Sequence, residues 1–147
     1  MNEIICATRG GQGSRAVRAR AITLAQETGL PLLFLFIVDL SHFSGHDNVL
    51  TEALQQEAYW LGRVMLEIAR QQAQSAGLQA EVVICEGIMR EELVRVLRQR
   101  RANRLLLGAP RRAAVSVFGD DAIEQFAQEI RQETDIPVEI VHPETTP

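Results

Sequence analysis

Short, continuous apolar runs alternate along the chain with longer segments in which apolar residues recur every three or four positions. The runs predict strands at residues 3–8, 32–38, 80–85, 105–107 and 138–141. The segments with helical periodicity predict helices that begin near residues 14, 50, 89 and 120. Strands that alternate with helices in this way are typical of an α/β fold with an open parallel sheet and helices on both faces.

The polarity of the strands predicts their order in the sheet. The second and fourth runs are purely apolar, which favours the interior of a sheet that is covered on both faces. The third run contains Glu81, and the fifth contains Glu139 and follows Pro137, which favours the two edges. The order 3-2-1-4-5 satisfies these preferences and places a topological switch point between strands one and four. We therefore expect any small-molecule site between the loops at residues 8–14 and 108–119.

The second helical segment is unusually long. About 28 residues of helix would measure roughly 42 Å, longer than a domain of this size is wide. We therefore expect this helix to start late or to bend near Gly62. Tyr59 and Trp60 are expected to pack on either side of it. The third helix is expected to end on Asn103 as a left-handed cap.

Length, composition and charge exclude several classes of protein. The 147 residues predict a single domain over 1–147, with a frayed tail at 143–147. A net charge of −4 and a longest apolar run of seven residues favour neither nucleic acid nor a membrane as partner. All 15 basic side chains are Arg, which excludes chemistry that depends on lysine. No leader segment is recognisable, and Cys6 and Cys85 are expected in the core of a cytoplasmic protein.

A glycine-rich segment after the first strand suggests one candidate ligand. Gly11, Gly13 and Ala16 fit the pattern Gly-x-Gly-x-x-Ala, and Asp39 ends the second strand where a ribose-binding acid would lie. The pattern is weak, because Arg9 and a further glycine stand where the tight turn should begin. A small NAD-binding sensor domain is therefore an alternative, not the leading interpretation.

A second set of segments, taken in order, resembles the universal stress protein family. The resembling segments are Ile5-Cys6-Ala7-Thr8, Phe36-Ile37-Val38-Asp39, the long second helix, Cys85-Glu86-Gly87, Leu105-Leu106-Leu107-Gly108 and Ile136-Pro137-Val138. The resemblance covers roughly residues 2–142. It implies a Rossmann-like fold of the adenine nucleotide alpha hydrolase kind and a non-catalytic role in the stress response.

The phosphate-binding pattern of the ATP-binding members of that family is degenerate here. Those members have Gly, two residues, Gly, nine residues, and then Gly followed by Ser or Thr. Gly108 and Gly119 match, but Arg111 replaces the second glycine, and Asp120 stands at the hydroxyl position with Asp121 behind it. Seven residues instead of nine separate Arg111 from Gly119, and Arg9 replaces an Asp after strand one.

These departures predict that ATP binding is weak or lost. The candidate nucleotide-binding residues are Ala7, Thr8, Arg9, Val38, Gly108, Arg111, Gly119 and Asp120. Carboxylates at a helix N-terminus repel phosphate, and an Arg paired to Asp120 would close the cleft. Alternatively, the arginines could hold phosphate themselves, which would give an AMP- or ATP-binding regulator or a slow ATPase.

The resemblance also implies a homodimer through the fifth strand. Val138 and Ile140 on that edge are expected to form the interface, with little protection beyond Glu139. Six arginines between residues 90 and 104 are interpreted as a solvated face balanced by Glu91 and Glu92. We expect no metal site, because His42 and His46 in one loop are typical of solvated side chains.

Overall fold

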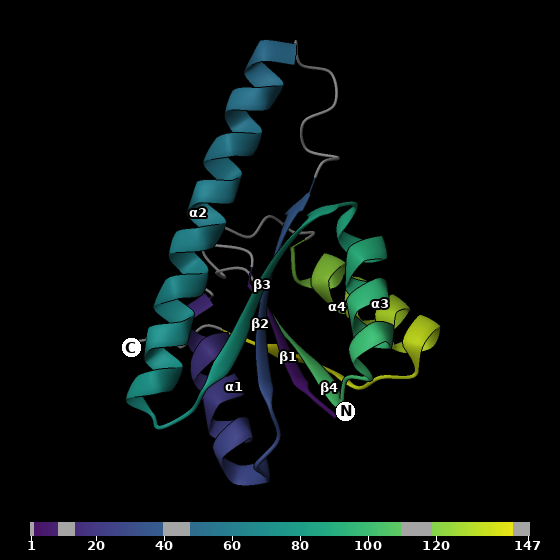
Figure 1. Ribbon diagram of the computed structural model, residues 1–147. Helices are drawn as coiled ribbons and strands as arrows, with labels where there is room; N and C mark the ends of the chain where they lie inside the picture. Colours follow the sequence, from purple (N-terminus) through teal and green to yellow (C-terminus); the bar gives the residue numbers. More distant parts are fainter. Residues whose placement is uncertain (1, 9–13, 40–47, 110–118, 143–147) are drawn as a thin grey trace, which may run out of the picture.

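The computed structural model describes residues 2–8, 14–39, 48–109 and 119–142 (Figure 1). Its elements are β1 (Ile4–Thr8), α1 (Ser14–Thr28), β2 (Leu32–Asp39), α2 (Asn48–Ser75), β3 (Ala80–Gly87), α3 (Met89–Arg100), β4 (Arg104–Gly108), α4 (Gly119–Thr134) and β5 (Val138–Val141). The five strands form one sheet in the order β3-β2-β1-β4-β5, with every pairing parallel. The predicted fold class and strand order are confirmed.

The sheet divides the apolar core into two layers. Alternate residues of β1, β2 and β4 point to opposite faces, as the period of two in a strand requires. Cys6 and Phe34 belong to the layer under α1 and α2, and Ile5 and Leu35 belong to the layer under α3 and α4. The continuous apolar runs are thus explained by burial on both faces.

Each of the helices α1 to α4 is followed by a left-handed residue: Gly29, Gly77, Arg101 and Asp135 respectively. Gly29 follows α1 with φ of +71°, a conformation that glycine adopts without strain. At the end of α3 the left-handed residue is Arg101 (φ +50°), whose backbone N–H donates to the carbonyl of Arg98. The predicted cap at Asn103 is wrong, because α3 already stops at Arg100 and the short β4 begins directly after Asn103.

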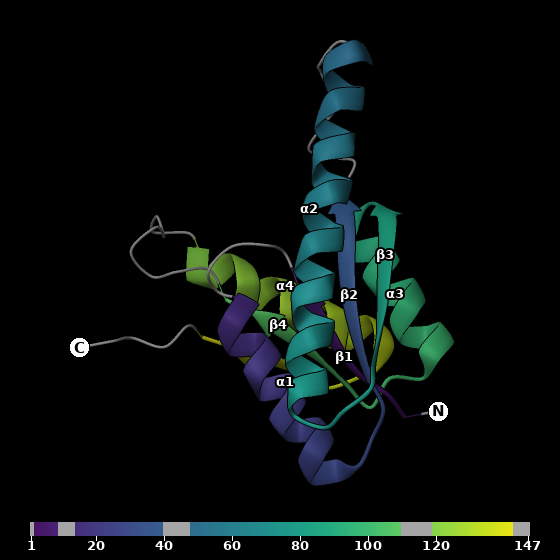
Figure 2. The ribbon, with the colours of Figure 1, turned by 60° about the vertical axis from the view of Figure 1, so that its left-hand side comes forward.

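Helix α2 is one uninterrupted helix of 28 residues. Its N-terminal part stands beyond the carboxyl ends of the strands (Figures 1 and 2). The predicted late start or bend near Gly62 is wrong, because the helix accommodates its length by projecting past the sheet. Gly62 lies where α2 packs closely on the sheet: a Cβ there would lie 2.6 Å from Cδ1 of Phe36 and 2.8 Å from Cδ1 of Ile84. The missing side chain lets α2 approach β2 and β3 closely.

The two aromatic residues of α2 differ in burial. Tyr59 is half-buried against the core layer under α1 and α2. Trp60 is 68% exposed, so its predicted packing is wrong.

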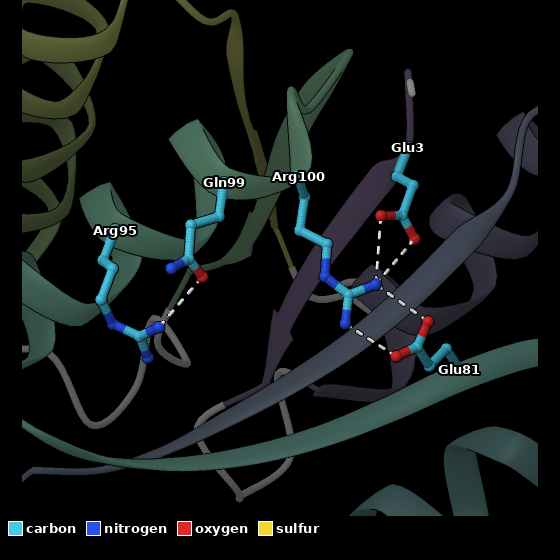
Figure 3. Close-up of polar contacts among 5 residues, drawn as sticks. All are labelled: Glu3, Glu81, Arg95, Gln99 and Arg100. Carbon is cyan, nitrogen blue, oxygen red and sulfur yellow. Dashed lines mark hydrogen bonds and ion pairs between the residues drawn. The ribbon is translucent and has the colours of Figure 1, made fainter.

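The arginine-rich stretch is tied to acidic residues from several elements. Arg100 Nη2 lies 2.7 Å from Glu81 Oε2, and its Nη1 lies 3.2 Å from Glu3 Oε1 (Figure 3). The hydrogen bonds of Arg100 lower the pKa of Glu81. Further ion pairs join Arg90 to Glu129 and Glu133, Arg95 to Glu92, and Arg104 to Glu139. Glu92 is thus one of several counterions, and most of the others come from distant elements.

Candidate functional site

The carboxyl ends of β1 and β4 lie side by side at the centre of the sheet. Ala7 pairs with Leu107 across this junction, and the chain leaves the two strands toward α1 and α4 respectively. The strand order reverses here, so the predicted switch point is present. In open α/β sheets this is where ligands bind.

The candidate residues at the carboxyl ends of β1, β2 and β4 are divided between the two faces of the sheet. Val38 belongs to the layer under α1 and α2, and by alternation Thr8 and Gly108 point to the same side. Ala7 belongs to the opposite layer under α3 and α4. The fold therefore brings Thr8, Val38 and Gly108 to one side and turns Ala7 away from them.

The described side chains at this edge are buried within the sheet. Ala7, Thr8 and Val38 are each only 2% exposed. The hydroxyl of Thr8 donates to the carbonyl of Leu35 over 3.4 Å, a long hydrogen bond. Among the described residues, the carboxyl ends of β1, β2 and β4 therefore offer a ligand mainly backbone groups.

The exit of β4 is fixed by a residue that sequence reasoning did not single out. Ala109 is 1% exposed, and its N–H donates to the carbonyl of Val141 over 2.8 Å. This bond extends the β4–β5 pairing by one residue beyond Gly108.

Two helices follow the strands of the switch point: α1 begins at Ser14 after β1, and α4 begins at Gly119 after β4. The unpaired N–H groups of a helix N-terminus attract anions, so both helices present favourable polarity to a phosphate. Asp120 lies in the first turn of α4, although its side chain is outside the described part of the chain. Arg9 and Arg111 also lie outside the described residues, as do Gly11, Gly13, His42 and His46.

Of the residues proposed for NAD, Ala16 and Asp39 are described. Ala16 lies in the first turn of α1, and Asp39 ends β2 with a partly buried side chain, as the pattern predicted. These positions are equally those of any Rossmann-like fold, so they do not distinguish NAD from another ligand.

Arg18 is the feature of this region that sequence reasoning missed. It lies one turn into α1, is only 7% exposed, and its Nε donates to Gln72 Oε1 on α2 over 2.8 Å. Within the described chain its Nη1 is buried without a hydrogen-bond partner. Burial lowers the pKa of Arg18, and burial also raises the pKa of the neighbouring Cys6 thiol to about 12. The available signal was position, since Arg18 lies between Val17 and Ala21 on the apolar side of α1.

Comparison with known proteins identifies the family. The profile of the Universal stress protein family matches residues 1–142. The chain belongs to this family. Members are stress-response proteins that are generally non-catalytic. No curated protein matches the chain in sequence.

Solved structures of the family share the fold at low sequence identity. Universal stress protein UspA from Lactobacillus plantarum superposes with a TM-score of 0.76 at 17% identity, covering 95% of this chain and 97% of that one. A universal stress protein in complex with cAMP gives a TM-score of 0.68 at 20% identity, with 97% and 98% covered. A family protein from Arabidopsis thaliana with AMP bound gives 0.63 at 15% identity, with 99% and 94% covered.

Across the described ranges, no helix is both long enough and apolar enough to cross a bilayer. Likewise, His, Cys, Asp and Glu side chains there form no group of three or more suited to a metal ion.

Proposed function

We propose that this universal stress protein is a non-catalytic cytoplasmic regulator that acts as a homodimer and holds ATP weakly or not at all. The observation that supports this is the position of Asp120, in the first turn of α4, where ATP-binding relatives have a hydroxyl. A phosphate about 4 Å from a carboxylate meets a repulsion of about 1 kcal/mol in water and several times more in a partly shielded site. Asp121 adds a second negative charge to the same turn.

Thermal denaturation with added nucleotide tests this proposal. A ligand at about 100 times its dissociation constant stabilises a protein by about 2.7 kcal/mol, or roughly 5–10 °C for a chain of this size. We expect no shift of the melting temperature with about 1–5 mM ATP. That concentration is about 100 times a dissociation constant of tens of micromolar, so binding of this strength would be detected. We expect a measurable shift for Asp120→Ser combined with Arg111→Gly. Glu124→Gln is the matched control, because it removes one charge from an exposed position of the same helix. A clear shift of the unmodified protein with ATP would overturn the proposal.

A second candidate function is binding of an adenosine monophosphate. Two structural neighbours are described with cAMP and with AMP, and a single phosphate carries less charge than a triphosphate. A single phosphate also extends less far toward α4, so the carboxylates of Asp120 and Asp121 repel it less. A melting-temperature rise with AMP or cAMP but not with ATP would support this function, and flat curves with all three would exclude it. NAD in the same assay tests the remaining alternative.

The homodimer is proposed to form through the open edge of β5. The carbonyls of Pro137 and Val141 accept hydrogen bonds from β4, so by alternation the backbone groups of Val138 and Ile140 point outward. The side chains of Val138 and Ile140 pack into the layer under α3 and α4. Only their backbone is therefore offered to a second copy. Arg131 already donates two hydrogen bonds to the Val138 carbonyl, at 2.7 and 3.2 Å, and would have to release it.

Replacing Val138 or Ile140 with Lys would disturb the core, because both side chains pack into it. The interface is therefore better tested through the backbone of β5. Ile140→Pro removes the outward N–H, whereas Ile140→Ala loses a similar side-chain volume and keeps that N–H. We expect Ile140→Pro to abolish the pairing of β5 between two copies and Ile140→Ala to retain it, as measured by the mass from light scattering. Equal masses for the two variants would contradict this interface.

A further inference from the structure

The outer edge of β5 is covered by a side chain that sequence reasoning did not single out. Arg131, in the last turn of α4, donates to the carbonyl of Val138 from Nε over 3.2 Å and from Nη2 over 2.7 Å. This carbonyl points away from β4, because the carbonyls that β4 uses are those of Pro137 and Val141. A guanidinium therefore occupies an acceptor that an added strand requires.

The one charged side chain on β5 itself is engaged within the subunit. The carboxylate of Glu139 lies 2.8 Å from Arg20 Nε and 3.7 Å from Arg104 Nη1. Because two guanidinium groups balance its charge, Glu139 repels an approaching strand much less than a free carboxylate does. The protection of this edge therefore comes mainly from Arg131.

Arg131 has no competing acceptor nearby. Among the residues that the structure describes, no carboxylate pairs with it, and the Val138 carbonyl is the only acceptor of its hydrogen bonds. Hydrogen bonds from a charged donor are roughly twice as strong as those between neutral groups. The backbone N–H of a second strand is therefore a weaker donor to the same oxygen than Arg131 is.

The position of this carbonyl decides which part of a strand pair is obstructed. In an antiparallel pair centred on Ile140, this residue and Ile140 of the partner subunit exchange both backbone hydrogen bonds. The next hydrogen-bonded pair joins Val138 to the partner subunit's His142, whose N–H requires the carbonyl that Arg131 holds. The twofold symmetry repeats this obstruction on the other side of the axis. The central pair is therefore open, and the flanking pairs are incomplete.

We propose that Arg131 sets the strength of β5 pairing between two copies of this chain. While its guanidinium caps the Val138 carbonyl, the copies associate weakly through the pair at Ile140. Its release lets the ladder extend and the association tighten. This inference rests on the proposed homodimer through β5 and adds the contact that regulates it.

Sedimentation equilibrium tests the role of Arg131. Arg131→Met keeps the aliphatic stem and removes the donors. We expect its dissociation constant to be at least about tenfold below that of the unmodified protein, because neither copy then gives up a charged hydrogen bond on pairing. Arg131→Lys keeps the charge but loses the planar fork of donors, so its dissociation constant should lie between these two values.

Arg98→Met is the matched control. Arg98 Nη2 also donates to a backbone carbonyl near the end of α4, that of Glu133 over 2.9 Å, but this carbonyl lies outside β5. We expect Arg98→Met to associate as the unmodified protein does. Adding Ile140→Pro to Arg131→Met should abolish the gain, because the proline removes the N–H of the central pair.

The outcomes separate this inference from the proposed homodimer. If Ile140→Pro weakens association but Arg131→Met leaves the dissociation constant unchanged, the homodimer stands and the role of Arg131 is overturned. If the unmodified protein is monomeric and Arg131→Met pairs through β5, the role of Arg131 stands and the proposed homodimer is overturned. Association that responds to neither substitution overturns both.

Discussion

Replacing Gly62 with alanine tests whether close packing, and not flexibility, explains this glycine. In an exposed helix the change would stabilise the protein by about 1 kcal/mol. Here the new methyl group would lie 2.6 Å from Phe36 Cδ1 and 2.9 Å from Phe36 Cε1, on a ring that is only 6% exposed. Overpacking of this kind costs about 1–3 kcal/mol. We therefore expect a net loss of about 1 kcal/mol.

Urea denaturation followed by circular dichroism measures this change. The control Gln56→Ala, on an exposed side of the same helix, should stay within about 0.5 kcal/mol. Phe36→Leu removes the ring edge but leaves Cδ1 of Ile84 2.8 Å from the new methyl group, so Gly62→Ala in that background should cost less than in the unmodified protein, with a coupling energy of about 1 kcal/mol. A stabilising Gly62→Ala in the unmodified protein, or no coupling to Phe36, would refute the reasoning.

Three further predictions follow from the buried and paired groups. The hydrogen bonds of Arg100 lower the folded-state pKa of Glu81. The ion pair therefore stabilises the folded state above the unfolded-state pKa of about 4.3, and this stabilisation is lost as the pH falls through the lowered folded-state pKa. Denaturation of Arg100→Gln should therefore depend less on pH between about 3 and 5, and an unchanged slope would contradict this. Native protein at pH 8 should react with one equivalent of a thiol reagent at Cys85, because burial raises the pKa of Cys6 to about 12; two rapid equivalents would be inconsistent. Arg18→Met should leave the melting temperature unchanged or raise it, since it removes a buried, partly unpaired guanidinium; a fall of several degrees would show that Arg18 is structurally required.

The candidate site was only partly predictable from the sequence. The switch point followed from strand polarity, because a strand covered on both faces must be apolar throughout. The division of Ala7 and Thr8 between the two faces follows from the alternation of side chains along β1. The burial of Arg18 did not follow, because it depends on the separation between α1 and α2. Ala109 was missed for a similar reason, since its hydrogen bond is to a strand 32 residues further along the chain.

The sequence by itself determined the number, kind and order of the elements and the two edge strands. These features depend on local periodicity and on polarity. The tertiary structure decided what depends on distances between elements. Gly62 allows close packing and does not mark a bend in α2, because Phe36 lies against it. Arg100 finds Glu81 and Glu3, 19 and 97 residues away, because the sheet brings β1 and β3 to the end of α3. Long side chains can reach many partners, and only the packing of the elements selects among them.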